Sequence, residues 1–256
     1  MWILERCATS SKAHPKFSLC CERGTVLLPP LPTTPATLCD LLTSNSPHAK
    51  KFREAIRSYN SSLAWTSLGA DIDLSVTGTQ GVYSFRVHGQ ICHHIGSLLP
   101  SEQQIATGKR PRFAQMYIYD TEHEAENRAS HFDGKKPDIN IIGELQHMLY
   151  EVNPYAHVYR SVRNILAENP AIDISMRIVL ERTTDSRRYN CPTADEVAAI
   201  MVGDGAEAVS KRQVIVQKQG GGLQEISERH PAYMPLQYPL LFPHGEDGWH
   251  HLIPLR

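Results

Sequence analysis

The sequence predicts an α+β fold, in which mixed, mainly antiparallel strands surround a central group of helices. Short segments such as 82–87 alternate apolar and polar residues between glycines, which is the pattern of half-buried strands. Between 121 and 168 the apolar residues recur instead at helical spacing, and strand patterns return at 172. Strands and helices gathered in blocks, rather than in strict alternation, are typical of the α+β class.

The N-terminal part is expected to contain an arm followed by two short helices. Residues 1–33 form the arm, because the run Leu28-Pro29-Pro30-Leu31-Pro32 holds too many prolines for a helix interior or a central strand. Ser46 and Pro47 supply an N-cap and a first-turn residue for the second helix, over 49–59.

The rest of the chain is expected to form three blocks. Strands are predicted at 63–68, 82–87 and 113–119, with a long polar loop at 101–112. Helices are predicted at 121–130, 138–150 and 154–168, followed by strands at 172–180, 197–202, 214–217 and 223–226.

These blocks predict two units with a boundary near residue 170. An α+β domain is expected over 34–170, and a strand-rich C-terminal part over 171–256. The second part ends in a proline-rich, aromatic segment at 230–250, which is too apolar for a solvated tail. We expect this segment to pack either on this domain or on a following one.

Composition excludes several classes of protein. The 256 residues are 41% hydrophobic and 21% charged, as in ordinary globular proteins. No apolar run is long enough for a membrane helix and no signal peptide is recognisable, so an intracellular soluble protein without a membrane partner is expected. The formal net charge of −1 argues against a uniformly basic surface, so any contact with nucleic acid must be local.

No catalytic motif is present in the sequence. A phosphate loop, a dinucleotide-binding glycine pattern and a Gly-x-Ser-x-Gly elbow are all absent. The two histidines of a rolling-circle nuclease would flank one apolar residue on a strand, whereas His93-His94 and His250-His251 are adjacent and would point to opposite faces. By motif the chain is not an enzyme.

Zinc binding is weighed at the two adjacent cysteines, Cys20 and Cys21. Structural zinc sites favour cysteines separated by two to four residues, and no second such pair exists in the chain. The alternative is that the cysteines are reduced thiols at the start of a strand. We therefore expect no cofactor, and at most an incomplete zinc site.

Small basic clusters are the remaining candidates for function. Such groups can contact phosphates of single-stranded DNA, although a solvated charged face is the alternative. The DNA-contact candidates are Lys50, Lys51, Arg53, Arg57, Lys109, Arg110 and Arg112, and a further cluster comprises Arg182, Arg187 and Arg188.

Several segments in order resemble the N-terminal region of Helitron-type rolling-circle transposases. The most specific is the closing run Leu236-Gln237-Tyr238-Pro239-Leu240-Leu241-Phe242-Pro243. The other matching segments include Pro15-Lys16-Phe17 with Cys20-Cys21, Phe85-Arg86-Val87-His88-Gly89-Gln90, His94-Ile95-Gly96-Ser97-Leu98-Leu99-Pro100, Phe113-Ala114-Gln115-Met116-Tyr117-Ile118-Tyr119-Asp120 and Asn153-Pro154-Tyr155-Ala156.

The resemblance implies a non-catalytic module that helps a nuclear transposase engage DNA, with the nuclease and helicase domains of the full-length protein as partners. The chain is expected to stop before those domains, as a truncated or degenerate copy would. The Cys-x-x-Cys pair of the family's N-terminus is missing here, which weakens the zinc expectation at Cys20 and Cys21. The alternative function is structural: a docking domain for the nuclease and helicase, or a fragment without independent function.

Overall fold

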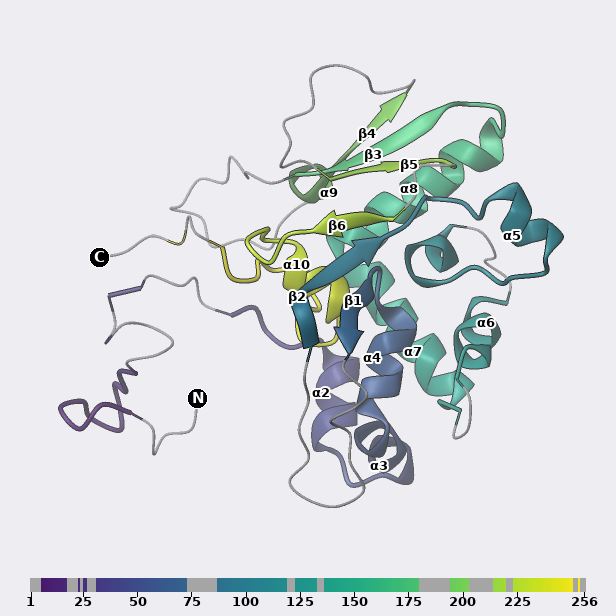
Figure 1. The fold of residues 1–256 in the computed structure, drawn as a ribbon. Helices are drawn as coiled ribbons and strands as arrows, with labels where there is room; N and C mark the ends of the chain where they lie inside the picture. Colours follow the sequence, from purple (N-terminus) through teal and green to yellow (C-terminus); the bar gives the residue numbers. More distant parts are fainter. Residues whose placement is uncertain are drawn as a thin grey trace.

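The computed structural model describes residues 6–17, 23, 25–26, 31–72, 87–118, 123–132, 136–179, 194–202, 214–219, 223–250 and 253. It confirms the α+β class. The described residues form a group of helices and two three-stranded antiparallel sheets, with strand orders β1-β2-β6 and β4-β3-β5 (Figure 1).

Three short helices follow the N-terminal arm. They are α2 (Ala36–Thr43), α3 (Pro47–Glu54) and α4 (Ile56–Leu63). Ser46 caps α3 as expected, since its side chain accepts a hydrogen bond from the Ala49 amide at 3.1 Å. The prediction of a single helix at 49–59 was wrong in one respect. The helical segment is divided at Ala55, whose backbone is not helical (φ −125°, ψ 23°).

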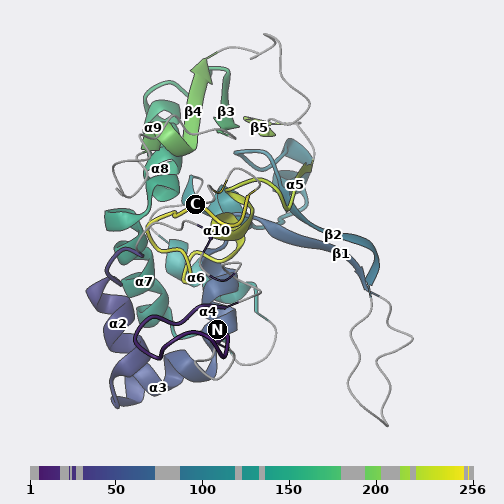
Figure 2. The ribbon, with the colours of Figure 1, turned by 90° about the vertical axis from the view of Figure 1, so that its left-hand side faces the viewer.

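The first sheet joins distant parts of the chain. Strand β1 (Ser67–Ile72) pairs with β2 (Val87–Ile95), and β6 (Gln224–Ile226) pairs with the other edge of β2. Figure 2 shows β1 and β2 extending away from the helices. The strand expected at 63–68 begins later, because the chain remains helical up to Leu63. The strand predicted at 82–87 falls almost entirely outside the described residues.

The segment after β2 differs most from the prediction. The expected loop at 101–112 contains helix α5 (Glu102–Ala106), which is closed by a capping box between Ser101 and Gln104. The strand expected at 113–119 is instead the 3₁₀ helix η4 (Phe113–Tyr117). The apolar alternation was misleading because four consecutive side chains, at 114–117, are all buried, whereas a half-buried strand would expose every second one.

The central helices match the prediction closely. They are α6 (Glu124–Ser130), α7 (Ile139–Val152) and α8 (Pro154–Glu168). Each of the last two begins after a side-chain cap, from Asp138 and Asn153 respectively. Their apolar faces supply much of the core.

The second sheet contacts α8. It consists of β3 (Ile174–Ile178), β4 (Ala198–Val202) and β5 (Val214–Gln217), with β3 in the centre. The short helix α9 (Ala194–Val197) replaces the start of the strand expected at 197–202, and both α9 and β4 contact α8.

The proline-rich C-terminal segment packs on this domain. It contains α10 (Tyr233–Gln237), whose Leu236 is fully buried and whose Leu236 carbonyl accepts a hydrogen bond from the Trp65 amide at 2.9 Å. One cluster of buried side chains runs from Leu38 to Leu240 and so includes residues on both sides of position 170. The division into two units there stays a prediction. Among the described residues, no helix combines the length and apolarity that crossing a membrane requires.

Candidate nucleic-acid interface

A basic hollow lies where the turn after α5 faces the end of α6. Gly108 adopts a left-handed conformation (φ +65°), and the Lys109 amide then donates to the Gln104 carbonyl at 2.9 Å. After this reversal of the chain, residues 109–112 run along the surface toward η4. Ser130 and His131, at the C-terminal end of α6, form the facing wall.

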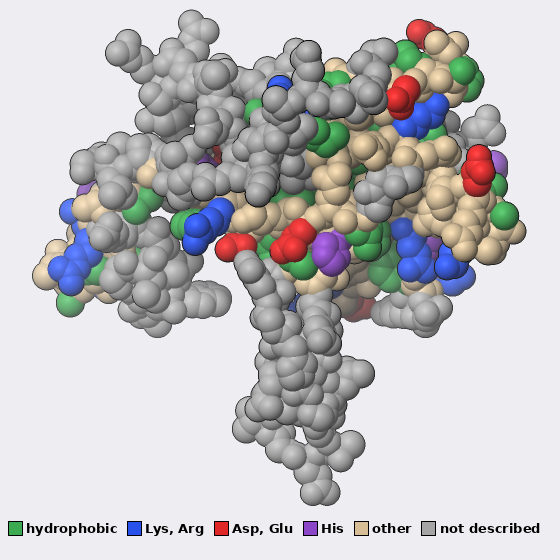
Figure 3. Space-filling view, turned by 45° about the horizontal axis from the view of Figure 1, so that its top comes forward, with side chains coloured by type: hydrophobic (Ala, Val, Ile, Leu, Met, Phe, Trp, Pro, Cys, Tyr) green, Lys and Arg blue, Asp and Glu red, His purple; other side chains and the backbone are tan. Residues whose placement is uncertain are grey.

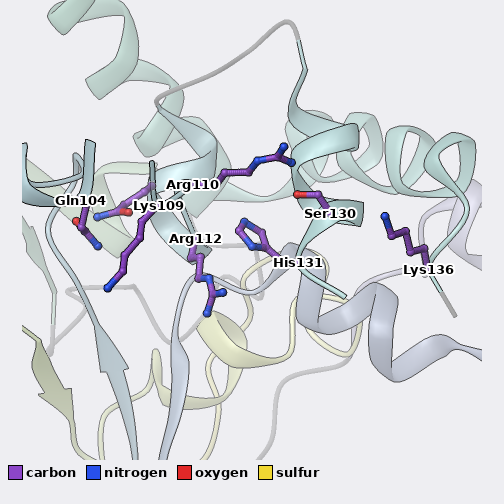
Figure 4. A pocket seen from close by; sticks show the side chains of 8 residues that line it. Gln104, Lys109, Arg110, Arg112, Ser130, His131 and Lys136 are labelled. Carbon is purple, nitrogen blue, oxygen red and sulfur yellow. The ribbon is translucent and has the colours of Figure 1, made fainter. Parts of the chain in front are cut away.

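The hollow has a volume of about 690 Å³ and a strongly positive lining. No described residue of the lining is acidic, and the lining side chains are Gln104, Lys109, Arg110, Arg112, Gln115, Ser130, His131 and Lys136 (Figure 4). The space-filling view shows Lys and Arg side chains grouped on the side of the molecule that carries α5 (Figure 3). The described residues offer no hydrogen-bond or ion-pair partner to the four lysine and arginine side chains, which are all exposed.

His131 connects the two walls of the hollow by a hydrogen bond. Its Nε2–H donates to the Pro111 carbonyl oxygen at 2.7 Å, so the α6 end and the 109–112 segment are held in one arrangement. Burial lowers the pKa of His131, and the nearby Arg112, Arg110 and Arg128 lower it further. The ring is therefore neutral at physiological pH, and the positive charge of the hollow comes from the lysines and arginines.

The backbone beside the hollow is strained. Phe113 has a φ of +53°, a conformation that costs a bulky residue on the order of 1–2 kcal/mol. Hydrogen bonds on either side hold it, from the Ala114 amide to the Trp65 carbonyl and from the Gln115 amide to the Arg112 carbonyl, both at 3.2 Å. These contacts with the rest of the fold thus hold the strained turn at Phe113, which follows Arg110 and Arg112 in the chain.

The structure separates the seven predicted DNA-contact residues into two groups. Lys109, Arg110 and Arg112 line the hollow, whereas the four cations of α3 and α4 do not. Of those four, Lys51 forms an ion pair with Asp138 at 3.2 Å, and Arg53 donates a hydrogen bond to the Ser44 carbonyl at the end of α2. The other two, Lys50 and Arg57, are exposed.

Arg53 terminates helix α2. Its Nη1 donates to the carbonyl oxygens of Leu41 at 3.0 Å and Ser44 at 2.8 Å, which the end of the helix leaves without helical partners. The guanidinium group of Arg53 is thus engaged with the backbone at the end of α2, and its contact with DNA stays a prediction.

Replacing Arg53 with methionine should destabilise the protein without weakening its binding to DNA. Loss of charge-assisted hydrogen bonds to helix-end carbonyls is expected to lower the free energy of unfolding by about 1.5–3 kcal/mol. Urea unfolding measures the first effect and DNA titration the second. An unchanged stability together with a weaker DNA affinity would instead make Arg53 a contact residue.

The cysteine and histidine candidates do not form a metal site in the described part of the chain. Cys20 and Cys21 lie outside the described residues, as do Arg182, Arg187 and Arg188. Within the described ranges, no three His, Cys, Asp or Glu side chains gather as a metal ion would require.

His93 and His94 point to opposite faces of β2, as their adjacent positions predict. His93 is buried and stacks on the Tyr233 ring at 3.7 Å between centroids. His94 lies against Cys92, with 3.2 Å between its Nε2 and the Cys92 Sγ. A Cβ at Gly69 would approach both side chains to within 3 Å, so glycine is needed there for this pair to fit.

Sequence reasoning missed five residues of the hollow. These are Gln104, Gln115, Ser130, His131 and Lys136. Lys136 ends a visible Lys-Lys doublet and could have been added to the basic clusters. The neutral residues carry no such signal, because only the packing of α5 and α6 brings them to the cations.

No protein-family model matches this chain, and no curated protein matches it either.

Proposed function

We propose that this chain is a non-catalytic module that binds phosphate groups of DNA, mainly single strands, at the basic hollow. The observation that carries the proposal is the set of four exposed cations, Lys109, Arg110, Arg112 and Lys136, which have no partner among the described residues and surround a hollow whose described lining has no carboxylate. In a chain of net charge −1, such a group is a local concentration of positive potential.

The types of cation fit phosphate. A guanidinium presents a planar fork of donors that binds phosphate oxygens in pairs, and a lysine adds a mobile point charge. None of the four groups has to break an existing ion pair within the described part of the chain in order to bind. Apart from His131 the described residues of the lining include no aromatic ring on which bases could stack, so the contacts that they offer would be to the backbone and independent of sequence.

The resemblance to Helitron-type transposases gives this site its biological setting. We propose that the module helps a nuclear transposase engage a strand during rolling-circle transposition, alongside nuclease and helicase domains. An alternative is a docking role, which is favoured by the 71% exposure of Leu241 and the 60% exposure of Trp249 in the C-terminal segment. Phosphate contacts predict salt-dependent binding to DNA, and apolar docking does not.

Neutralising the two arginines of the hollow should weaken binding and reduce its dependence on salt. Each lost phosphate contact is expected to lower the slope of log affinity against log salt by about 0.7 for a single strand. The measurement is fluorescence anisotropy of a labelled oligothymidylate at several salt concentrations, comparing the unmodified chain with the double variant Arg110→Gln/Arg112→Gln.

Lys12→Gln/Lys16→Gln is the matched control, because the N-terminal segment lies on the opposite side of the molecule from α5 (Figure 1). It also removes two exposed charges and should leave the slope unchanged. Absence of binding by the unmodified chain at low salt would contradict the proposal and favour the docking role. An equal loss in the control and the double variant would show that only overall charge matters.

A further inference from the structure

The hollow carries more positive charge than one internal phosphate of a strand needs. Two lysines and two arginines supply four formal positive charges, and the described lining offers no carboxylate to offset them. An internal phosphodiester brings one negative charge. A terminal phosphomonoester brings about −1.5 to −2 at neutral pH and three acceptor oxygens.

We propose that the hollow binds the terminal phosphate of a nucleic-acid strand rather than an internal phosphodiester. This inference rests on the proposed function, since it concerns which phosphate the same cations select. Three acceptor oxygens can take more donors at once than the two non-bridging oxygens of an internal diester. Figure 4 shows the guanidinium group of Arg110 beside Ser130 and that of Arg112 pointing away from it, so these exposed side chains would have to turn to share one phosphate.

One neutral donor of the hollow fits a terminal phosphate as well. Ser130 and Gln115 both belong to the lining, and Gln115 is largely buried. In Figure 4 the labelled side chains come from both walls, with Lys109 toward one end of the hollow and Lys136 toward the other. The Ser130 hydroxyl donates to the Asn127 carbonyl at 2.8 Å, and Gln115 Nε2 donates to the Ser97 hydroxyl at 3.5 Å, so the second N–H of the Gln115 amide is the neutral donor left for a phosphate oxygen.

The shape of the site also favours a strand end. A protein that holds the interior of a single strand uses a basic groove that follows several nucleotides, on the order of 4–16 for one OB-fold domain. Here the cations gather around a hollow of about 690 Å³. On the side of the hollow toward α3, the positive charge of Lys51 is offset by its ion pair with Asp138. Asp138 lies two residues after Lys136 in the sequence.

The test compares oligothymidylates of one length that carry a 5′-phosphate, a 3′-phosphate or hydroxyl groups at both ends. We expect at least one phosphorylated form to bind the unmodified chain about tenfold more tightly than the hydroxyl form, as one additional charge-assisted contact would give. A hydroxyl-ended oligonucleotide one nucleotide longer controls for added charge and should bind like the parent hydroxyl form. The end that gives the gain identifies the polarity of the bound strand.

Two variants assign the effect to the hollow. Arg110→Gln/Arg112→Gln should abolish the preference for the phosphorylated end, and Lys50→Gln/Arg57→Gln, which removes two exposed cations of α3 and α4, should retain it. Salt-dependent binding with equal affinity for all oligonucleotides would overturn the terminal-phosphate inference while leaving the proposed function standing. Binding to none of them would overturn both.

Discussion

Replacing Arg128 with methionine is expected to lower the free energy of unfolding by about 3–5 kcal/mol, the largest effect of any single substitution considered for this chain. Arg128 is fully buried, and Glu124, one helical turn earlier on α6, is 4% exposed. Removing one member of a buried ion pair leaves the other charged and unpaired in a medium that solvates it poorly.

The contacts of Arg128 explain why the loss is large. Its guanidinium donates to the Ser62 carbonyl at 2.6 Å, to Gln146 at 3.2 Å and to Glu124 at 3.4 Å, and lies 4.2 Å from the centre of the Tyr117 ring. One side chain thereby joins α6 to α4, α7 and η4. Methionine fills a similar space but satisfies none of these polar groups.

Glu124 is held by partners of its own. The Tyr150 hydroxyl donates to it at 2.7 Å, and the amide of Gln146 donates as well. Burial raises the pKa of Glu124, and the charge of Arg128 opposes that rise. Without Arg128 the pKa of Glu124 should rise further, so the variant should lose less stability at acidic pH, where the carboxyl group is protonated in both the folded and the unfolded state.

Urea unfolding of the variant at two pH values measures both effects. Arg57→Met removes an exposed arginine of α4 and should change stability by no more than about 0.5 kcal/mol. The double variant Arg128→Met/Glu124→Gln should be more stable than Arg128→Met alone, because no buried charge is then left unpaired. A single variant as stable as the unmodified protein would show that the network does not hold α6, and with it the wall of the hollow, in place.

Local signals in the sequence predicted the parts of the fold that local chemistry decides. Ser46-Pro47 and Asn153-Pro154 mark the starts of α3 and α8, because a side-chain cap and a proline in the first turn act within a few residues. The strand at 214–217 was likewise predicted with its observed bounds. At 113–119 the prediction was wrong, since burial on all sides, which creates η4, depends on distant residues such as Trp65.

The candidate site was predictable only in part, for the same reason. The run Lys109, Arg110 and Arg112 is visible as a basic cluster, but so is the cluster on α3, where Arg53 turned out to cap α2. Glu124 and Arg128 have the spacing of an exposed ion pair on a helix surface, and nothing local reveals that they are buried. Charge alone therefore does not distinguish a ligand contact from a cap or a core network.

Asn153→Ala is the second substitution with a large expected effect, about 2–4 kcal/mol of unfolding free energy. The Asn153 side chain is buried and has two roles. Its Oδ1 accepts from the Tyr155 amide at 3.0 Å at the start of α8, while its Nδ2 donates to the Pro243 carbonyl at 3.0 Å. Alanine removes the cap and also leaves a buried carbonyl of the C-terminal segment without its donor.

Comparing alanine with aspartate separates the two roles. Asn153→Asp keeps the acceptor that caps α8 but turns a carboxylate oxygen toward the Pro243 carbonyl, so it should destabilise at least as much as Asn153→Ala if attachment of the C-terminal segment dominates. Asn140→Ala, at an exposed position of α7, is the matched control and should have little effect in urea unfolding. If Asn153→Asp is as stable as the unmodified protein, capping dominates and the attachment at Asn153 contributes little. If aspartate costs as much as alanine, the attachment through Asn153 stabilises the fold, and the proline-rich segment is part of the folding unit.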